Sequence, residues 1–440
     1  MSNDVLIFGK CAELLRKTVQ PKEAFALPYI GLEHIGEGIL HLNGYGLASD
    51  ITSTKFMFRK GDILFGKLRP YFRKVIRAPF SGICSTDIWV IKPLGEIDQG
   101  FLFYWVASQG FVDFSMKGSE GTRMPRAKWE HVSKHEIPAF SVSEQRTIAH
   151  ILGTLDDKIE LNRRMNETLE AMAQAIFKSW FLDFDPVRAK MEGRPTGLPK
   201  EIADLFPDSF EDSELGEIPR GWKHLQFGQL LEDTIGGDWG KEYPEGDFDQ
   251  PISIIRGTDL PDLASGFVGK APTRFTTKKK LVSRLLQHGD IVVEVSGGSP
   301  TQPTGRSLYI SSSMLKRFEH PVVCASFCRR FRPINGSLGV LAAFHLTNLY
   351  YEGGTWEYQN QSTGIANFQT NHFLEAEKVL VPCEKVLGAF IHFVEPLIAK
   401  MAANENLTLS EFRDILLPKL LSGEIRVSDP EKFLEFVNVK

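Results

Sequence analysis

Few residues of this chain stand at the spacings that catalysis requires. The stretch Gly297–Ser307 superficially resembles a phosphate-binding loop, but Arg306 stands where that loop needs lysine. Two residues of the stretch are prolines, which cannot donate a backbone N–H. The motifs H-E-x-x-H and G-x-S-x-G, a dinucleotide-binding turn and an amino-methyltransferase motif are all missing from the sequence. The sequence therefore predicts binding rather than catalysis.

Positive charge gathers in one segment of a chain whose net charge is −4, a value that argues against indiscriminate nucleic-acid binding. Between positions 55 and 77 the basic residues are Lys55, Arg59, Lys60, Lys67, Arg69, Arg73, Lys74 and Arg77, against one acid, Asp62. The last part of this segment interleaves cations with two aromatic residues directly after a Gly-Asp turn. Such a loop could place Lys67, Arg69, Arg73 and Lys74 against phosphates while the aromatics anchor it. The alternative is a solvated basic face.

A second pair of segments carries side chains that can read bases. Arg123, Arg126 and Lys128 lie within 118–129, and the matching segment 362–373 holds amides, among them Asn367, Gln369 and Asn371. Arginine bonds guanine edges, and asparagine or glutamine bonds adenine edges. Different chemistry at matching positions is what two domains that read different sequences would show, although an ordinary polar loop is an equal alternative for any single residue. We add Arg306 to the candidate DNA contacts.

The match between these segments belongs to a repeat that covers most of the chain. Gly61–Leu64 returns as Gly289–Val292, and Ile137–Pro138 returns as Val381–Pro382. Between these points Cys84, Lys92 and Pro93 return as Cys324, Arg332 and Pro333. Each copy reads as short strands, turns and a few helices, so the expected class is α+β. A unit used twice gives two similar surfaces, which suits two places on one long partner.

A long helix is expected after each copy. Ser141 and Glu144 have the spacing of a capping box. The apolar stripe that follows is Ile148, Leu152, Leu155, Ile159, Asn162, Met165, Leu169, Met172 and Ile176. The second helix runs through Leu387, Phe390, Val394, Leu397, Met401, Leu407, Phe412 and Ile415, with Gly423 as its stop.

Antiparallel packing of the two helices would bury both stripes in a coiled coil with one globular unit at either end. Thirty helical residues span roughly 45 Å, somewhat over one turn of duplex DNA. Asn162 and Asn404 lie in or beside the stripes. They either face solvent at the edge of the seam, which the sequence slightly favours, or fix the helix register.

These elements predict six parts: a first domain at 1–142, a helix at 143–183, a linker at 184–218, a second domain at 219–383, a second helix at 384–424 and a tail at 425–440. No apolar run approaches the roughly 20 residues that span a bilayer, and the first residues lack a signal layout. The five cysteines are scattered, and Cys324 with Cys328 lacks a second ligand pair for zinc, so both are expected to be core residues. A cytoplasmic protein without a metal or membrane partner is therefore expected.

The long helix expected after the first copy contains Glu144, Gln145, Arg146, Ile148, Ala149, Leu155, Asp156, Lys158, Ile159, Asn162, Asn166, Leu169, Glu170, Trp180 and Phe181. The linker contains the segments Phe184–Lys190, Leu205–Phe210 and Ile218–Trp222. At these residues the chain resembles the specificity subunits of Type I restriction-modification systems, and the resemblance covers essentially its whole length. Two features depart from the family pattern: the N-terminus lacks an Ile-Pro-x-Gly-Trp segment, and Cys383-Glu384-Lys385 replaces the Glu-Gln-Arg start of the first helix.

The resemblance implies two target-recognition domains, each reading one half of a bipartite, asymmetric site in double-stranded DNA. It implies that the helices set the gap between half-sites and dock two modification subunits, in a complex that restriction subunits can join. S-adenosylmethionine, ATP and magnesium would be bound by those other subunits and none by this chain. A structural adaptor whose two domains bind polypeptides is the alternative, although the basic segment speaks against it.

Overall fold

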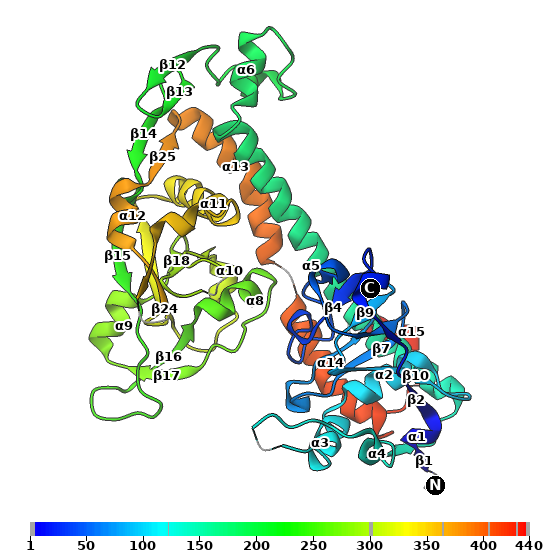
Figure 1. Cartoon of the computed structure of the whole chain (residues 1–440). Helices are drawn as coiled ribbons and strands as arrows, with labels where there is room; N and C mark the ends of the chain where they lie inside the picture. Colours follow the sequence, from blue (N-terminus) through cyan, green and yellow to red (C-terminus); the bar gives the residue numbers. More distant parts are fainter. Residues whose placement is uncertain are drawn as a thin grey trace. The chain divides into compact units, whose positions relative to one another are not determined.

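The computed structural model describes residues 5–121, 123–298, 302–362, 365–403, 405–427 and 430–436. Its contacts divide the chain into two compact units: unit 1 comprises Met1–Leu161 and Thr408–Lys440, and unit 2 comprises Asn162–Leu407. Each unit combines small sheets with helices (Figure 1). This mixed content agrees with the α+β class expected from the sequence.

Unit 1 is built on a four-stranded antiparallel sheet. Its strands, in order, are β2 (Ala12–Leu15), β10 (Ile88–Pro93), β7 (Ile63–Gly66) and β8 (Val75–Arg77). A five-stranded sheet contains β3 (Thr18–Val19), β6 (Lys55–Phe58), β9 (Gly82–Cys84), β4 (Pro28–Ile30) and β5 (Gly46–Leu47), and β1 (Val5–Ile7) pairs with β11 (Glu136–Pro138). The shorter helices are α1 (Phe8–Cys11), α2 (Gln99–Ala107), α3 (Gln109–Lys117) and α4 (Trp129–Val132).

Unit 2 repeats the four-stranded order. Its strands are β15 (Leu231–Gly236), β22 (Cys328–Pro333), β18 (Ile291–Glu294) and β20 (Ser307–Tyr309). Smaller sheets contain β17 (Thr273–Thr276), β16 (Gln250–Ile255) and β21 (Val322–Cys324); β19 (Ser296–Gly297), β24 (Ile365–Phe368) and β23 (Gln359–Ser362); and β14 (Lys223–Gln226) with β25 (Lys378–Val381). Its helices include α8 (Leu260–Ala264), α9 (Lys278–Arg284), α10 (Ser312–Leu315), α11 (Gly336–Tyr351) and α12 (Thr370–Ala376).

The Gly-Asp turn found twice in the sequence has the same structure in both units. Asp62 and Asp290 are buried, and their Oδ2 atoms accept the backbone N–H of the residue three positions earlier at 2.7 Å. Each carboxylate also pairs with a cation of the neighbouring strand: Lys92 at 3.5 Å from Asp62, and Arg332 at 2.8 Å from Asp290. The internal repeat predicted from the sequence is therefore confirmed as a repeat of structure.

The helix α5 (Val142–Phe181) begins at the predicted capping box. Ser141 Oγ accepts the Glu144 N–H at 3.2 Å, and Glu144 Oε2 accepts the Ser141 N–H at 2.9 Å. These reciprocal bonds satisfy two donors that a helix start would otherwise leave free. Leu155 and Ile159 are buried in unit 1, whereas Met172 is 49 % exposed because the packed face of the helix has turned to Ala173.

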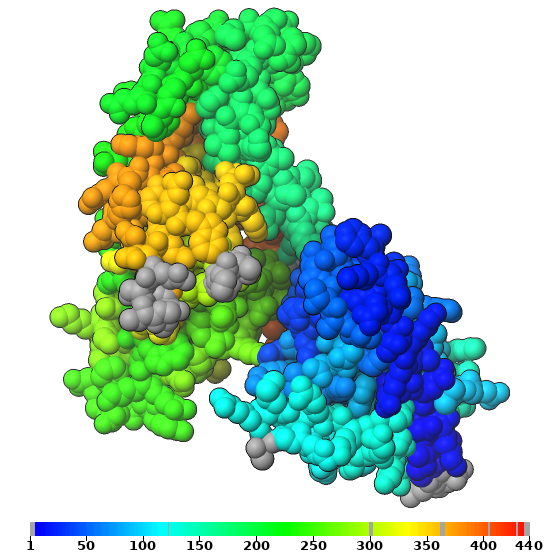
Figure 2. Space-filling model, viewed as in Figure 1, coloured from blue at the N-terminus to red at the C-terminus, as the bar shows by residue number. Residues whose placement is uncertain are grey.

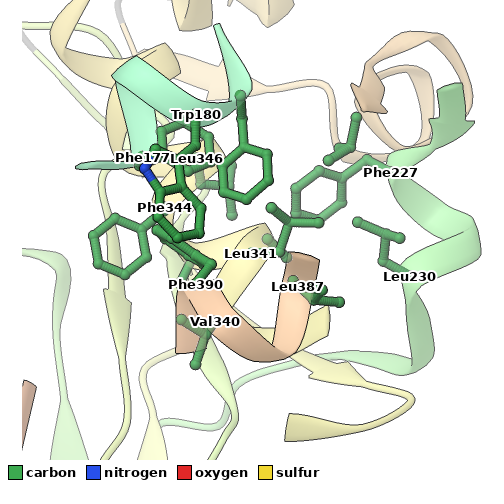
Figure 3. Close-up of a cluster of buried hydrophobic side chains, with 14 of the residues drawn as sticks. Phe177, Trp180, Phe227, Leu230, Val340, Leu341, Phe344, Leu346, Leu387 and Phe390 are labelled. Carbon is green, nitrogen blue, oxygen red and sulfur yellow. The ribbon is translucent and has the colours of Figure 1, made fainter. Parts of the chain in front are cut away.

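In unit 2 the second half of α5 packs antiparallel on α13 (Glu384–Ala402). Asn166 Nδ2 donates to the Met401 carbonyl at 3.5 Å near one end of the contact, and the rings of Phe177 and Phe390 lie 6.2 Å apart near the other. Leu169 and Leu397 are half-buried along the same pair of helices. Figure 3 shows Phe177, Trp180, Phe344 and Phe390 in one apolar cluster with α11.

In unit 1 the first half of α5 packs antiparallel on α14 (Asn406–Leu421). Arg413 Nη1 donates to Asp156 Oδ1 at 2.9 Å, and farther along the chain His150 contacts Glu431 at 2.9 Å. Gly423 has a φ of +76°, the left-handed conformation that ends a helix, as the sequence predicts. Each half of α5 is therefore covered by a later helix that runs the opposite way.

The prediction of one helix over 384–424 is wrong. The segment contains α13 and α14, with Ala403 as the C-cap of α13. The sequence has Asn404 and Asn406 at this break, and asparagine is a weak helix former that favours helix ends. Asn404 lies outside the described residues. Asn162 is buried and donates to Asn406 Oδ1 at 3.0 Å, so the solvent-facing alternative is wrong for Asn162.

The linker and the C-terminal tail both contain helices. The linker contains α6 (Asp185–Met191), α7 (Lys200–Ala203) and a hairpin of β12 (Phe210–Ser213) and β13 (Gly216–Pro219), and its Val187 and Phe206 enter the core of unit 2. Linker atoms form much of the upper surface of unit 2 in Figure 2. The C-terminal tail contains α15 (Pro430–Phe436), which buries Leu434 in unit 1.

Cys324 and Cys328 are buried, as predicted for core residues; Cys11 and Cys84 are also buried, and Cys383 is exposed. One stretch, Glu384–Leu421, is long and apolar enough to cross a membrane by length and composition alone. Core helices of soluble proteins pass the same test, and α13 buries Leu387, Phe390 and Val394 in unit 2. This stretch is therefore weak evidence for a membrane span.

Candidate nucleic-acid interface

Three segments of unit 1 meet at the end of β7. The Lys67 N–H donates to the Asp87 carbonyl at 2.9 Å, and the Ala127 N–H donates to the Lys67 carbonyl at 2.9 Å. The loop after β7, the turn before β10 and the segment 118–128 are thus joined by backbone bonds that any sequence could make. Their side chains are free to vary on this frame.

Unit 2 repeats this junction bond for bond. The Val295 N–H donates to the Phe327 carbonyl at 2.9 Å, and the Phe368 N–H donates to the Val295 carbonyl at 2.8 Å. Lys67 therefore corresponds to Val295, Asp87 to Phe327, and Ala127 to Phe368. One position before Ala127 and Phe368 stand Arg126 and Asn367, which places the arginine-bearing and amide-bearing segments on equivalent sites.

The junction of unit 1 is charged. Asp87 stands between two cations, with Arg126 Nε at 3.2 Å and Lys67 Nζ at 4.0 Å from its Oδ1. The Arg126 side chain is 48 % exposed, and Arg123 is exposed beside it. Lys128 forms an ion pair with Glu120. The carboxylate of Asp87 orients two cations toward solvent, an arrangement that suits a polyanion or a guanine edge.

The other predicted basic residues of unit 1 hold the turn η4 (Pro70–Phe72) in place. Lys74 Nζ donates to the Leu32 carbonyl at 2.7 Å, and Arg73 Nη2 donates to the Gly38 carbonyl at 2.7 Å. The Arg69 guanidinium lies 6.0 Å from the Phe72 ring centre. Lys55 is buried, which lowers its pKa. Some side chains of the predicted basic loop therefore stabilise the fold of unit 1 through hydrogen bonds within it.

The junction of unit 2 is amide-rich. Asn367 on β24 accepts a hydrogen bond from Ser296 Oγ at 2.5 Å, and Asn367, Gln369 and Asn371 are exposed. The hairpin of β23 and β24 that carries Asn367 has its tip, residues 363–364, outside the described residues. Arg306 is 23 % exposed, lies 3.9 Å from Glu294 and stacks at 6.0 Å over Tyr350. Arg306 thus already has protein partners.

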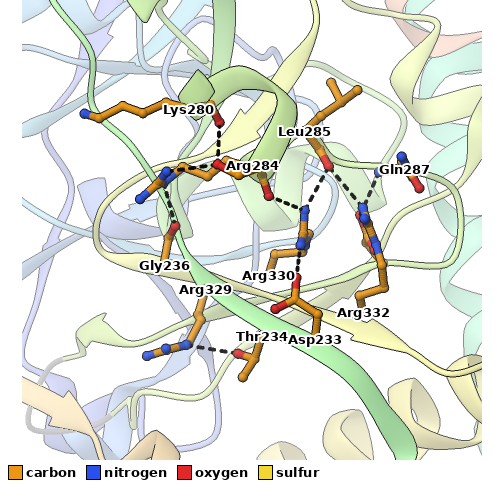
Figure 4. Close-up of polar contacts among 12 residues, drawn as sticks. Asp233, Thr234, Gly236, Lys280, Arg284, Leu285, Gln287, Arg329, Arg330 and Arg332 are labelled. Carbon is orange, nitrogen blue, oxygen red and sulfur yellow. Dashed lines mark hydrogen bonds and ion pairs between the residues drawn. The ribbon is translucent and has the colours of Figure 1, made fainter. Parts of the chain in front are cut away.

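Arginines on β22 are also engaged inside unit 2 (Figure 4). Arg330 is buried, forms an ion pair with Asp233 and donates to the Ser283 and Leu285 carbonyls at 2.9 and 3.2 Å. Arg329 Nε donates to Thr234 Oγ1 at 3.0 Å. These guanidiniums donate to carbonyl, carboxylate and hydroxyl oxygens within the fold, so the number of arginines on β22 says nothing about DNA binding.

Several candidate contacts escaped prediction from the sequence. Asp87 and Phe327 lie at the centre of the two junctions, and the Phe327 side chain is 59 % exposed. In the sequence, only their position directly before the repeated strand (β10 in unit 1 and β22 in unit 2) indicates these two residues. Lys278 and Lys279 are exposed at the start of α9, and their run of three lysines was available as a signal.

Leu397 and Met401, which the sequence places on the apolar stripe of the second spacer helix, lie on α13 within unit 2.

Among the described residues no three His, Cys, Asp or Glu side chains gather as a metal site. Burial raises the pKa of Glu294, and Arg306 opposes that shift. The junctions offer hydrogen-bond donors, acceptors and an exposed ring, and these are groups that recognise a ligand.

Comparison with known proteins gives consistent matches. Residues 3–171 match the family model described as the Type I restriction modification DNA specificity domain. The chain is 26 % identical over 416 residues to the Type I restriction enzyme HindI specificity subunit of Haemophilus influenzae, with 84 % of this chain and 88 % of the relative covered. It is 25 % identical over 394 residues to the MjaIX specificity subunit of Methanocaldococcus jannaschii, covering 85 % and 79 % of the two chains.

A solved structure shares the fold. The crystal structure of a Type-I restriction-modification system S subunit from M. genitalium aligns with a TM-score of 0.52 and 16 % identity, and the alignment covers 95 % of each chain. The likeness of fold therefore covers nearly the whole of both chains.

Proposed function

We propose that this chain, which belongs to the family of Type I restriction-modification specificity subunits, binds double-stranded DNA and supplies the sequence specificity of a Type I complex. Unit 1 would read one half of a bipartite, asymmetric site and unit 2 the other half. The observation that carries this proposal is the repeated junction, where identical backbone bonds present Lys67, Asp87 and Arg126 in one unit and Val295, Phe327 and Asn367 in the other.

The chemistry of the two junctions supports different targets. Arg126 has the donor fork that matches guanine O6 and N7, and Asn367 has the donor and acceptor that match adenine N6 and N7. An exposed aromatic ring such as Phe327 can contact the methyl group of thymine. Lys67, Lys278 and Lys279 would contact phosphates, which fix the position of a protein on the duplex without reading sequence.

The helices would form an antiparallel coiled-coil spacer. Contacts of α5 with α13 in unit 2 and with α14 in unit 1 support this arrangement. The spacer would set the gap between half-sites and dock two modification subunits, and restriction subunits would join that complex. This chain would be non-catalytic and cytoplasmic and would hold no cofactor. S-adenosylmethionine, ATP and magnesium would serve the other subunits.

Competition binding with the reconstituted complex tests the proposal. Methylated adenines mapped in the host genome would first give the motif and its gap. A duplex carrying that motif should compete far better than duplexes altered in either half, because specific sites typically bind 10³–10⁷ times more tightly than other DNA. Equal competition by all duplexes at fixed salt would contradict the proposal.

A further inference from the structure

The turn that carries the basic loop of unit 1 has an unusual backbone. Arg69 and Arg73 flank Pro70–Phe72 and have φ angles of +50° and +47°. Non-glycine residues seldom adopt this left-handed conformation, and they keep it only where surrounding contacts enforce it. The contacts made by these two arginines should therefore explain why the turn tolerates them.

Unit 2 places glycine where unit 1 places Arg73. The Gly66 N–H donates to the Lys74 carbonyl at 2.9 Å, and the Glu294 N–H donates to the Arg306 carbonyl at 2.8 Å, so Lys74 corresponds to Arg306. The preceding residue in unit 2 is Gly305, with a φ of +94°. Glycine meets this backbone requirement without steric cost. The backbone conformation alone would favour glycine at position 73, so the contacts of the arginine side chain must account for Arg73 in unit 1.

The Arg73 side chain joins the turn to the helix pair of unit 1. Its Nη2 donates to the Gly38 carbonyl at 2.7 Å and lies 3.5 Å from Asp414 Oδ1, and the side chain is 16 % exposed. Asp414 Oδ1 also accepts from Arg413 Nη2 and Nε at 3.0 and 3.1 Å. Asp414 therefore lies between two arginines, one on the turn and one on α14.

Arg413 continues the chain of contacts into the core. It is buried, and its Nη1 donates to Asp156 Oδ1 at 2.9 Å on α5. The other oxygen of Asp156 accepts the hydroxyl of the buried Tyr104 at 2.7 Å. Charged groups in such a position are held by their partners, because removal of one partner leaves an uncompensated buried charge.

We propose that Arg413 and Asp414 are positioning residues for the turn η4 (Pro70–Phe72) of unit 1, and this inference rests on the proposed function. They hold Arg73, and through it the orientation of the segment that bears Lys67 and the exposed Tyr71. Arg73 then acts through the position of its neighbours rather than as a phosphate contact. The Asp156–Arg413 pair anchors the whole connection to the helices.

Asp414→Asn in the complex reconstituted with modification subunits tests this role. It keeps the side-chain shape and removes the charge that faces Arg73. We expect discrimination in the half-site read by unit 1 to fall by about tenfold, as for one mismatched base pair, with the other half-site unchanged. Glu411→Gln makes the same charge change on the exposed face of α14 and should alter neither half-site.

Arg73→Gly separates positioning from folding. Glycine suits the left-handed backbone, as Gly305 does in unit 2, so thermal stability should be kept while discrimination in one half-site falls. Combined with Asp414→Asn, it should add little, because both changes break one connection. Full additivity, or unchanged discrimination in Asp414→Asn, would overturn the positioning role. A wild-type complex without sequence preference would instead contradict the proposed function.

Discussion

In unit 1 the buried strand β10 reads Ile-Trp-Val-Ile-Lys-Pro, whereas the equivalent strand β22 of unit 2 reads Cys-Arg-Arg-Phe-Arg-Pro. Val90 of the first strand is fully buried among apolar residues. Arg330 of the second is equally buried, because Asp233 and two backbone carbonyls satisfy its guanidinium. The same frame accepts an aliphatic or a cationic side chain wherever the neighbours supply matching partners.

The contact between helices and sheet domain differs in the same way. In unit 1 the Asp156–Arg413 pair joins α5 to α14, and Asp156 also accepts the Tyr104 hydroxyl from α2. Ser141 and Cys383 occupy matching positions before α5 and α13, so Ile398 on α13 stands where Asp156 stands on α5. Unit 2 instead has a cavity of about 420 Å³ lined by Ile398, Glu170, Val340 and Phe344. The repeat thus preserves backbone pairing and leaves side-chain chemistry to diverge.

Replacement of the turn aspartates should give the largest effect. Asp290→Ala would leave Arg332 without its two-point partner, and loss of one member of a buried pair costs about 3–5 kcal/mol. Asp62→Ala should cost less, because Lys92 lies 3.5 Å from Asp62, whereas Arg332 makes two hydrogen bonds of 2.8 Å to Asp290. Urea unfolding of the full chain measures both losses, with exposed Asp247→Ala as the control. Equal losses at the two turns would mean that their ion pairs do not differ in strength.

Exchange of the junction side chains should alter base preference. Arg126→Asn should change preference in the half-site of unit 1 only, and Asn367→Arg in that of unit 2 only. Each variant should change the free energy that separates the right base pair from a wrong one by about 1–3 kcal/mol at one position. Competition between duplexes that differ by a single base pair measures this change. A change in both half-sites from either variant would remove that residue from the readout.

Neutralised lysines should weaken binding without changing preference. Lys67→Gln in unit 1 and Lys279→Gln in unit 2 should each lower the slope of log affinity against log salt by about 0.9 if the lysine contacts a phosphate. Titrations at several salt concentrations measure the slope. Lys200→Gln in the linker makes the same charge change and should leave the slope unaltered. A sequence-dependent loss would reassign the lysine to base contact.

Loss of the helix cap should give the smallest effect. Ser141→Ala should destabilise unit 1 by about 1 kcal/mol, a typical value for a cap. The Ser141 backbone N–H and then its hydroxyl lower the pKa of Glu144. The hydrogen bonds that Glu144 accepts therefore stabilise the fold at pH values above the ordinary pKa of a carboxyl group. This contribution disappears as the pH falls through the lowered pKa of Glu144. Unfolding at pH 7 and pH 3 should show a smaller difference between wild type and variant at pH 3. The start of α13 at Cys383 has no side-chain cap and offers no such pH dependence.

Local signals in the sequence were sufficient for much of the fold. The Ser141–Glu144 spacing gave the start of α5, and the repeated Gly-Asp turn gave the equivalence of the sheets. Both depend on residues close in sequence. The break between α13 and α14 was not predicted, because the apolar periodicity that continues through it outweighed the asparagines at positions 404 and 406. A tertiary contact, the Asn162–Asn406 hydrogen bond, decides which asparagine is buried.

The candidate site was predictable by segment but not by side chain. Arg126 and Asn367 were correctly placed on matching segments. The partner of Arg126, Asp87, is 39 residues away and becomes visible only when strands pair. Arg73 was read as a cation available to a phosphate, whereas its Nη2 atom already contacts Gly38. Spacing reveals which residues lie on a loop, and packing decides which of them remain available.

The position of the cysteines has a practical consequence. Burial raises the pKa of the Cys84 and Cys324 thiols to about 12, so these groups resist alkylation at neutral pH. Cys383 is exposed at the cap of α13. A maleimide dye should therefore attach at this single point of the native sequence. The native protein can therefore carry a single probe at the start of α13 without any engineered cysteine.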